Sequence, residues 1–154
     1  TPNSAAAGQP SGAGLGVAAT GVAALVAAAR ARTRDLSPGE LAAARAAGAT
    51  VVDVREPDEI AREGAIPGAV RVPRGLLEWR ADPGSAHHHP ALDPARPVVL
   101  YCAAGGRSAL AADTLRAMGY GDVSHLGAGF AGWVAAGEPV ERADAGPGAG
   151  SGSS

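Results

Sequence analysis

The chain has 154 residues, which is long enough for one domain with a self-sufficient hydrophobic core. Its 13 cationic and 15 carboxylate side chains leave a formal net charge of −2, which argues against nucleic acid or an anionic membrane as a partner. A single cysteine excludes an internal disulfide. Nothing therefore indicates an oxidising compartment, and we expect a cytoplasmic protein.

The two ends of the chain differ in composition from the part between them. Residues 1–14 and 143–154 are small, polar and rich in glycine, a composition typical of disordered tails. The next segment, 15–34, contains an uncharged apolar stretch that is shorter than the roughly 20 residues of a membrane span and lacks the basic leader of a secretory signal. We expect instead a helix packed on the domain through apolar residues at helical spacing, which are Ala18, Val22, Leu25, Val26 and Ala29.

The domain proper, residues 35–142, begins with a capping box. Ser37 lies three positions before Glu40, and Pro38 occupies the first helical position, so a helix is predicted from Pro38 to Ala47. Glycine follows and ends it. We then expect a buried strand over 50–54, a helical turn at 56–59, a bend at 64–68 and a second buried strand over 70–72.

The second half of the domain continues this alternation. Residues 74–89 mix Pro, Gly and His with large apolar residues, which predicts a short helix and a long surface loop. Further elements are a strand over 98–101, a helix over 108–118, a strand over 123–126 and a helix over 130–135. Strands alternating with helices predict an α/β fold with a central parallel sheet, helices on both faces, and ligands bound beyond the carboxyl ends of the strands.

The only cysteine lies at such a strand end. Cys102 follows the apolar run 98–101 and precedes small residues, two glycines and Arg107, where a helix begins. Backbone N–H groups and the helix dipole converge on an anion at such a place. Positive surroundings lower the pKa of a cysteine thiol from about 8.5 to roughly 3.5–7.5, so the pattern predicts a nucleophile. The alternative is a buried structural cysteine.

Four motifs in this chain resemble those of the rhodanese-homology family, in the family's order. They are Asp53-Val54-Arg55-Glu56-Pro57, Gly64-Ala65-Ile66-Pro67-Gly68-Ala69, the cysteine loop Cys102–Ser108, and Gly129-Phe130-Ala131-Gly132-Trp133. Together they cover about residues 35–140. The resemblance implies a rhodanese-like three-layer α/β domain and a sulfurtransferase that needs no cofactor.

The resemblance also implies a mechanism. The Cys102 thiolate takes sulfur from a small donor such as thiosulfate, and the resulting persulfide passes it to cyanide, a thiol or a sulfur-accepting protein. We expect loop N–H groups to hold the extra sulfur, Gly105 and Gly106 to supply unusual dihedral angles, and Arg107 to orient the donor's sulfonate. The expected binding residues are Ala103, Ala104, Gly105, Gly106, Arg107 and Ser108. Behind them, Asp53 and Arg55 either position the loop or form a structural ion pair.

Two other functions fit part of the pattern. A cysteine-dependent phosphatase uses the same thiolate, cradle and arginine, but its loop has one residue more between cysteine and arginine than the four found here. A non-catalytic rhodanese-like interaction module is the second alternative, although members of that kind commonly lack the cysteine.

A run of three histidines, His87-His88-His89, raises the question of a metal site. Adjacent histidines in a loop seldom converge on one ion, and no cysteine or carboxylate completes a spaced set of ligands. We therefore expect a solvated loop and no metal.

Overall fold

Strands and helices alternate along the chain in the computed structural model, which describes residues 18–142. Both predicted tails, 1–14 and 143–154, lie outside these residues. The strands are β1 (Arg34–Leu36), β2 (Thr50–Asp53), β3 (Val70–Arg71), β4 (Val98–Tyr101) and β5 (Val123–Leu126). The helices are α1 (Val22–Arg32), α2 (Pro38–Ala46), α3 (Pro57–Glu63), α4 (Leu77–Ala81) after a 3₁₀ turn (Arg74–Leu76), α5 (Gly106–Ala117) and α6 (Gly129–Ala135).

The strands of the described chain form one sheet in the order β1-β5-β4-β2-β3, with every neighbouring pair parallel. The predicted fold class is confirmed. Because all strands run the same way, their carboxyl ends lie at one edge of the sheet, and β4 delivers Cys102 to the middle of that edge.

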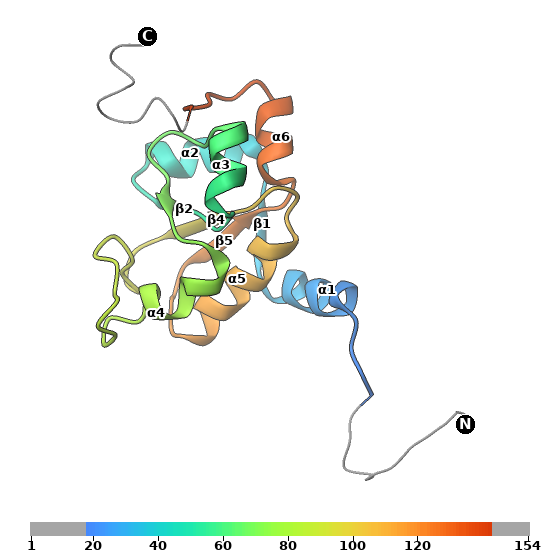
Figure 1. Cartoon of the computed structure of the whole chain (residues 1–154), viewed down its shortest axis with the longest axis vertical. Helices are drawn as coiled ribbons and strands as arrows, with labels where there is room; N and C mark the ends of the chain where they lie inside the picture. The colour runs from blue at the N-terminus through green and yellow to red at the C-terminus, as the bar shows by residue number, and fades with distance from the viewer. Residues whose placement is uncertain (1–17, 143–154) are drawn as a thin grey trace.

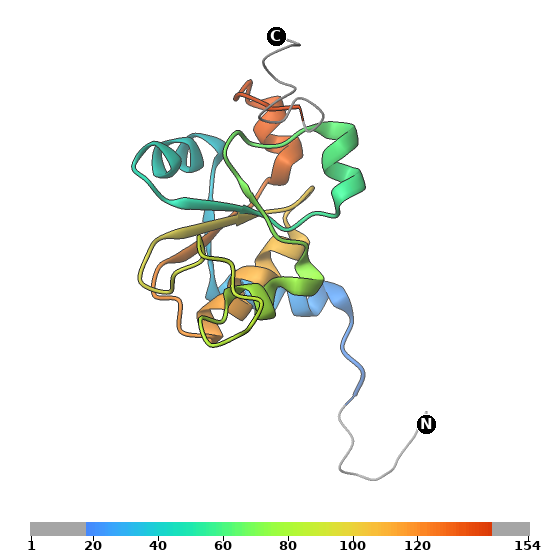
Figure 2. The same ribbon diagram turned by 60° about the vertical axis from the view of Figure 1, so that its left-hand side comes forward.

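Helices cover both faces of the sheet, as Figures 1 and 2 show. Side chains of a strand alternate between the two faces. On β4, Leu100 packs with α4 and α5, whereas Val99 and Tyr101 pack with α2 and α6. All four residues of β4 are buried, which explains why its sequence reads as an unbroken apolar run.

The predicted strands over 50–54, 98–101 and 123–126 are confirmed, with small differences at their ends. The capping box is confirmed as well, since Glu40 N donates to Ser37 Oγ at 3.1 Å and Ser37 N donates to Glu40 Oε1 at 2.8 Å. The helix after the cysteine loop begins at Gly106, two residues before its predicted start.

Strand β1 was not predicted from the sequence. Its burial pattern is exposed, exposed, buried, because Arg34 and Asp35 lie at the edge of the sheet. Only Leu36 carries an apolar signal, and three residues are too few to display an alternation. Pairing with β5, which places Asp35 opposite His125, creates this strand.

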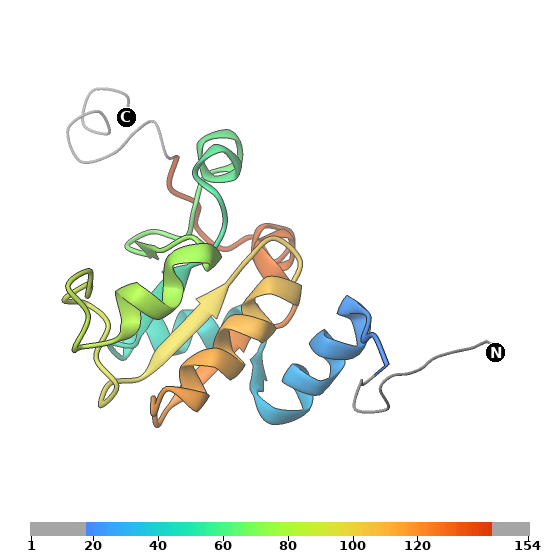
Figure 3. The same ribbon diagram turned by 60° about the horizontal axis from the view of Figure 1, so that its bottom comes forward.

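Helix α1 lies beside α5, as Figure 3 shows. The predicted apolar stripe is wrong in its detail: Ala29 is buried, but Val22 and Leu25 are 69% and 49% exposed. A two-point ion pair attaches the helix instead, with Arg32 Nε and Nη2 donating to the Asp113 carboxylate at 2.9 and 2.7 Å. No helix of the described residues has the length and apolar character needed to cross a bilayer.

Candidate active site

Cys102 is buried just beyond the end of β4, with 1% of its surface exposed. Its Sγ accepts backbone hydrogen bonds from Gly105 N at 3.1 Å and from Ser108 N at 3.3 Å. The Ser108 hydroxyl lies 3.6 Å from the same sulfur. Of the expected binding residues, these two therefore direct N–H groups at the resting sulfur, and this arrangement stabilises negative charge there.

Gly105 allows the loop to turn back on the cysteine. Its φ is +105°, a left-handed conformation that L side chains rarely adopt. A Cβ atom at this position would collide with Gly127 O and would approach Arg30 Nη2 to 2.6 Å. Gly106 has no positive φ and simply begins α5. The prediction that both glycines supply unusual dihedral angles is therefore correct for Gly105 only.

The closing Gly-aromatic motif holds the loop from the other side. Phe130 N donates to Cys102 O at 2.8 Å, and Ala131 N donates to Ala103 O at 3.2 Å. Gly129 has a φ of +69°, and a Cβ there would collide with the carbonyl of Ala103. These contacts explain why a motif near residue 130 accompanies a cysteine loop near residue 102.

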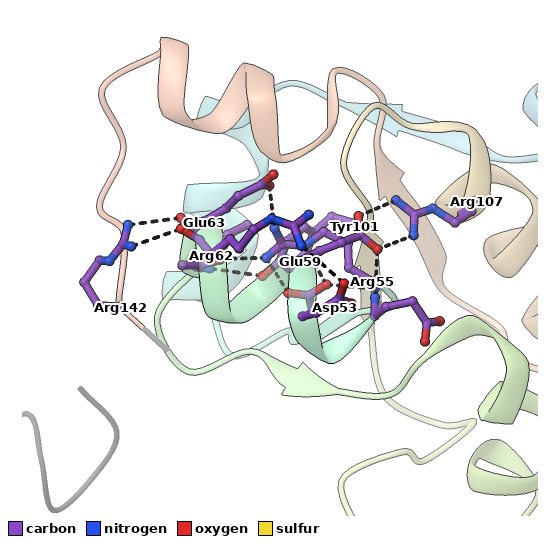
Figure 4. Close-up of polar contacts among 12 residues, drawn as sticks. Asp53, Arg55, Glu59, Arg62, Glu63, Tyr101, Arg107 and Arg142 are labelled. Atoms are coloured by element: carbon purple, nitrogen blue, oxygen red, sulfur yellow. Dashed lines mark hydrogen bonds and ion pairs between the residues drawn. The ribbon is translucent and has the colours of Figure 1, made fainter. Parts of the chain in front are cut away.

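Arg107 points from the first turn of α5 toward α3 (Figure 4). Its Nη1 and Nη2 donate to the two carboxylate oxygens of Glu59 at 2.7 and 2.9 Å. The hydrogen bonds from Arg107, helped by one from the Glu56 backbone, lower the pKa of Glu59 to about 2. The expected role of Arg107 in orienting a donor stays a prediction. In this structure its guanidinium is paired with the Glu59 carboxylate.

Asp53 and Arg55 form a fully buried ion pair. Arg55 Nε and Nη2 donate to the Asp53 carboxylate at 3.0 and 2.8 Å, and Nη2 also donates to Gly64 O at 2.7 Å (Figure 4). The guanidinium carbon lies 4.3 Å from the ring centroid of Phe130, whose N–H binds the Cys102 carbonyl. The pair thus supports the loop through Phe130 and does not contact the sulfur.

A second polar group near the cysteine was missed in the sequence. His125 on β5 is fully buried, and its Nδ1 lies 3.0 Å from Ser108 Oγ. Its Nε2 lies against Asp35 Oδ1. The sequence carries one signal, since His125 is the single ionisable residue of a short predicted strand. In the structure His125 is in register with Leu100, which faces α5. That register was not readable before the strand order was known.

The three loop histidines do not converge on a common point. His88 Nε2 contacts Leu92 O at 2.7 Å, and His89 Nδ1 accepts from Ala91 N at 3.0 Å. The expectation of a solvated loop is correct for His87, which is exposed, and wrong for His88 and His89, which are half-buried. Within residues 18–142, no three His, Cys, Asp or Glu side chains gather as metal ligands would.

Comparison with known proteins places this site in context. Residues 37–136 match the family model described as rhodanese-like domain. A sulfurtransferase from Allochromatium vinosum is 37% identical over 90 residues, which are 58% of this chain and 76% of that protein.

Two solved structures share the fold. A protein of unknown function from Rhodopseudomonas palustris, described as a possible tyrosine phosphatase, is 37% identical with a TM-score of 0.76, over 82% of this chain and 98% of that one. A polysulfide-sulfur transferase homodimer from Wolinella succinogenes is 31% identical with a TM-score of 0.62, over 76% and 84% of the two chains.

Proposed function

The chain belongs to the rhodanese-like domain family, and from this premise we propose that it is a sulfurtransferase carrying sulfur as a persulfide on Cys102. One observation supports the proposal most directly: the only cysteine lies at a buried strand end with two backbone N–H groups on its sulfur, at 3.1 and 3.3 Å. A structural cysteine needs no such donors. A reacting thiolate does, because they stabilise its charge.

The proposed reaction has two steps. The Cys102 thiolate attacks the outer sulfur of thiosulfate, the S–S bond of the donor breaks, and sulfite leaves with the bonding electron pair. Cyanide or a thiolate acceptor then attacks the outer sulfur of the persulfide, and the Cys102 thiolate is regenerated. No cofactor is needed, since donor and acceptor balance the electrons between them. The partners are therefore small sulfur compounds or a sulfur-accepting protein, in the cytoplasm, where a lone thiol stays reduced.

A phosphatase reaction is the second candidate, because the similar Rhodopseudomonas palustris protein is described as a possible tyrosine phosphatase. The loop argues against it here. Four residues separate Cys102 from Arg107, a ring that suits one sulfur atom better than a phosphoryl group. A non-catalytic module is disfavoured by the presence of Cys102 and its N–H donors.

Intact-mass measurement separates these functions. Treatment with thiosulfate should add the mass of one sulfur atom, and cyanide should remove it with release of thiocyanate. Cys102→Ser should show neither change, because a hydroxyl is far less acidic than a thiol and the chain has no other cysteine. Absence of the mass gain in the wild type would refute the persulfide, and hydrolysis of an aryl phosphate without sulfur transfer would favour the phosphatase.

A further inference from the structure

A chain of polar side chains leads from the buried sulfur to the protein surface, through Ser108, His125 and Asp35. We propose that His125 is a positioning residue that accepts the thiol proton of Cys102 through the Ser108 hydroxyl. The inference deepens the sulfurtransferase proposed above, since a persulfide forms only on a thiolate. It rests on side chains outside the cysteine loop, apart from Ser108.

Strand register brings these groups to one face of the sheet. Asp35 on β1 is the direct neighbour of His125 on β5, and His125 is the direct neighbour of Leu100 on β4. Residues opposite each other in parallel strands point to the same face, and Leu100 and Cys102 share the face covered by α5. Ser108, in the first turn of α5, lies between the sulfur and the imidazole.

The contacts are continuous along this path. Cys102 Sγ lies 3.6 Å from Ser108 Oγ, and Ser108 Oγ lies 3.0 Å from His125 Nδ1. His125 Nε2 lies against Asp35 Oδ1, and Asp35 Oδ2 accepts from Arg30 Nη1 at 3.1 Å. Cys102, Ser108 and His125 are buried, whereas the Asp35 side chain is 50% exposed. The path therefore connects a sulfur in a closed site with solvent.

The charge of Asp35 favours one imidazole tautomer, although His125 Nε2 makes no hydrogen bond within the described residues. A carboxylate against Nε2 favours a proton on that nitrogen, which leaves the Nδ1 lone pair directed at the Ser108 hydroxyl. Ser108 then donates to Nδ1 and accepts from the Cys102 thiol. The hydroxyl has a second acceptor within reach, Gly105 O at 3.2 Å, which holds it in place when Nδ1 is protonated.

The proton transfer balances without any other reactant. The Cys102 proton moves to Ser108 Oγ while the Ser108 hydroxyl proton moves to His125 Nδ1. The products are a thiolate, an intact serine hydroxyl and an imidazolium whose Nε2–H faces Asp35. No bond between heavy atoms changes and no electron is transferred.

The surroundings of the imidazole keep it neutral in the resting protein. Burial lowers the pKa of His125, with Arg30 acting in the same direction and Asp35 opposing. These are the charged side chains that face it, from α1 and β1, while Cys102 approaches from β4 through Ser108. The imidazole is therefore neutral at neutral pH with Nδ1 vacant, and Asp35 is the charged group that stabilises the imidazolium formed when Nδ1 accepts the proton.

The pH profile of Cys102 alkylation by iodoacetamide tests the proposal, since a single cysteine makes the signal unambiguous. Ser108→Ala removes the hydroxyl but keeps the backbone N–H, and His125→Asn keeps a polar group that does not titrate. Each should move the midpoint upward by about one pH unit and slow alkylation at neutral pH on the order of tenfold. Asp35→Asn should also move the midpoint of the alkylation profile upward, but by less.

Asp122→Asn is the matched control, because it removes the same charge beside the same pair of strands. Asp122 is exposed and lies 3.8 Å from Arg34 Nη2, just before β5 and therefore at the opposite end of the sheet from Cys102. Its profile should match the wild type. Thermal unfolding of each variant verifies folding. If His125→Asn does not fold, Ser108→Ala decides, and an unchanged profile for a folded Ser108→Ala overturns the proposal.

Nitrogen-15 NMR of the imidazole supplies an independent readout. The reduced protein at neutral pH should show His125 as a neutral Nε2–H tautomer, and a neutral Nδ1–H tautomer would refute the relay because Nδ1 could not accept a proton. Alkylation requires no sulfur transfer. The variants could therefore shift the pH profile of Cys102 alkylation even if the protein gains no sulfur from thiosulfate. That result would support proton transfer to His125 while refuting the proposed sulfurtransferase function.

Discussion

Arg107 and Glu59, 48 positions apart, meet in a two-point ion pair with distances of 2.7 and 2.9 Å. The pair joins the first turn of α5 to α3 beside the cysteine loop. Hydrogen bonds from Arg107 lower the pKa of Glu59 to about 2, so the carboxylate is charged at physiological pH. An anionic donor that approaches Arg107 therefore meets a guanidinium whose charge is already balanced.

Neutralising Glu59 should strengthen donor binding. In Glu59→Gln the guanidinium loses its counter-charge and becomes a stronger site for a sulfonate. We expect the KM for thiosulfate to fall severalfold, measured as thiocyanate release in the presence of cyanide. Asp58→Asn is the control, because Asp58 precedes Glu59 on α3, is 77% exposed and pairs with Arg62. A KM that rises in Glu59→Gln would mean that the ion pair positions the loop and does not compete with the donor.

Replacing Arg107 tests its predicted role toward the donor directly. Arg107→Lys keeps the charge but loses the fork, and a charge-assisted hydrogen bond is worth about 1.5–3 kcal/mol, so kcat/KM for thiosulfate should fall on the order of ten- to a hundredfold. Arg107→Ala should lose more. Arg116→Lys, with an exposed pair at 3.0 Å to Asp113, supplies the control. Wild-type kinetics in Arg107→Ala would assign the arginine a structural role only.

The two loop glycines should respond differently to alanine. At Gly105 a Cβ collides with Gly127 O in a backbone of φ +105°, so Gly105→Ala should lower the melting temperature and abolish sulfur transfer. At Gly106 the nearest atom is Val26 Cγ2 at 3.9 Å. Gly106→Ala should therefore leave the melting temperature unchanged or raise it slightly, since alanine is favoured in helices by about 1 kcal/mol. Equal melting temperatures for both variants would contradict the loop geometry.

Breaking the buried Asp53–Arg55 pair should destabilise the fold strongly. Arg55→Met leaves the Asp53 carboxylate buried without its partner, a situation that costs about 3–5 kcal/mol. Arg62→Met breaks an exposed pair with Asp58 and should cost below about 0.5 kcal/mol. Urea unfolding measures both changes. A loss for Arg55→Met no larger than that for Arg62→Met would show that the buried pair is not needed for stability.

Acid should reveal the Glu59 contribution to stability. Its pKa is about 2 in the folded protein and about 4.3 in an unfolded chain, so the folded state holds the proton less tightly. The stabilisation is present above the unfolded value and is lost as the pH falls through that window toward 2. Glu59→Gln should therefore be less stable than wild type at neutral pH, by about 1 kcal/mol for a partly exposed pair. Urea unfolding should show that the stability difference between wild type and Glu59→Gln vanishes near pH 2. A difference that persists at that pH would show that it does not arise from the charge of Glu59.

The part of the protein that depends on near neighbours in the chain was predictable from the sequence. The capping box of α2 needs only Ser37 and Glu40, and runs of apolar residues predict the buried strands. The left-handed turn at Gly105 lies within the short loop that begins with Cys102. Each feature arises from backbone geometry and side-chain chemistry within a few residues. The four ordered motifs then sufficed to predict the family and the parallel sheet.

Only the tertiary structure decided which distant groups meet at the sulfur. Asp35 faces His125 because β1 pairs with β5, and His125 reaches Ser108 because β5 lies beside β4 with α5 packed on that face. Glu59 reaches Arg107 across 48 positions. Strand order and register are set by burial of the whole sheet between two helical layers, and a shift of one residue would turn His125 to the opposite face. No local pattern of residues encodes that choice.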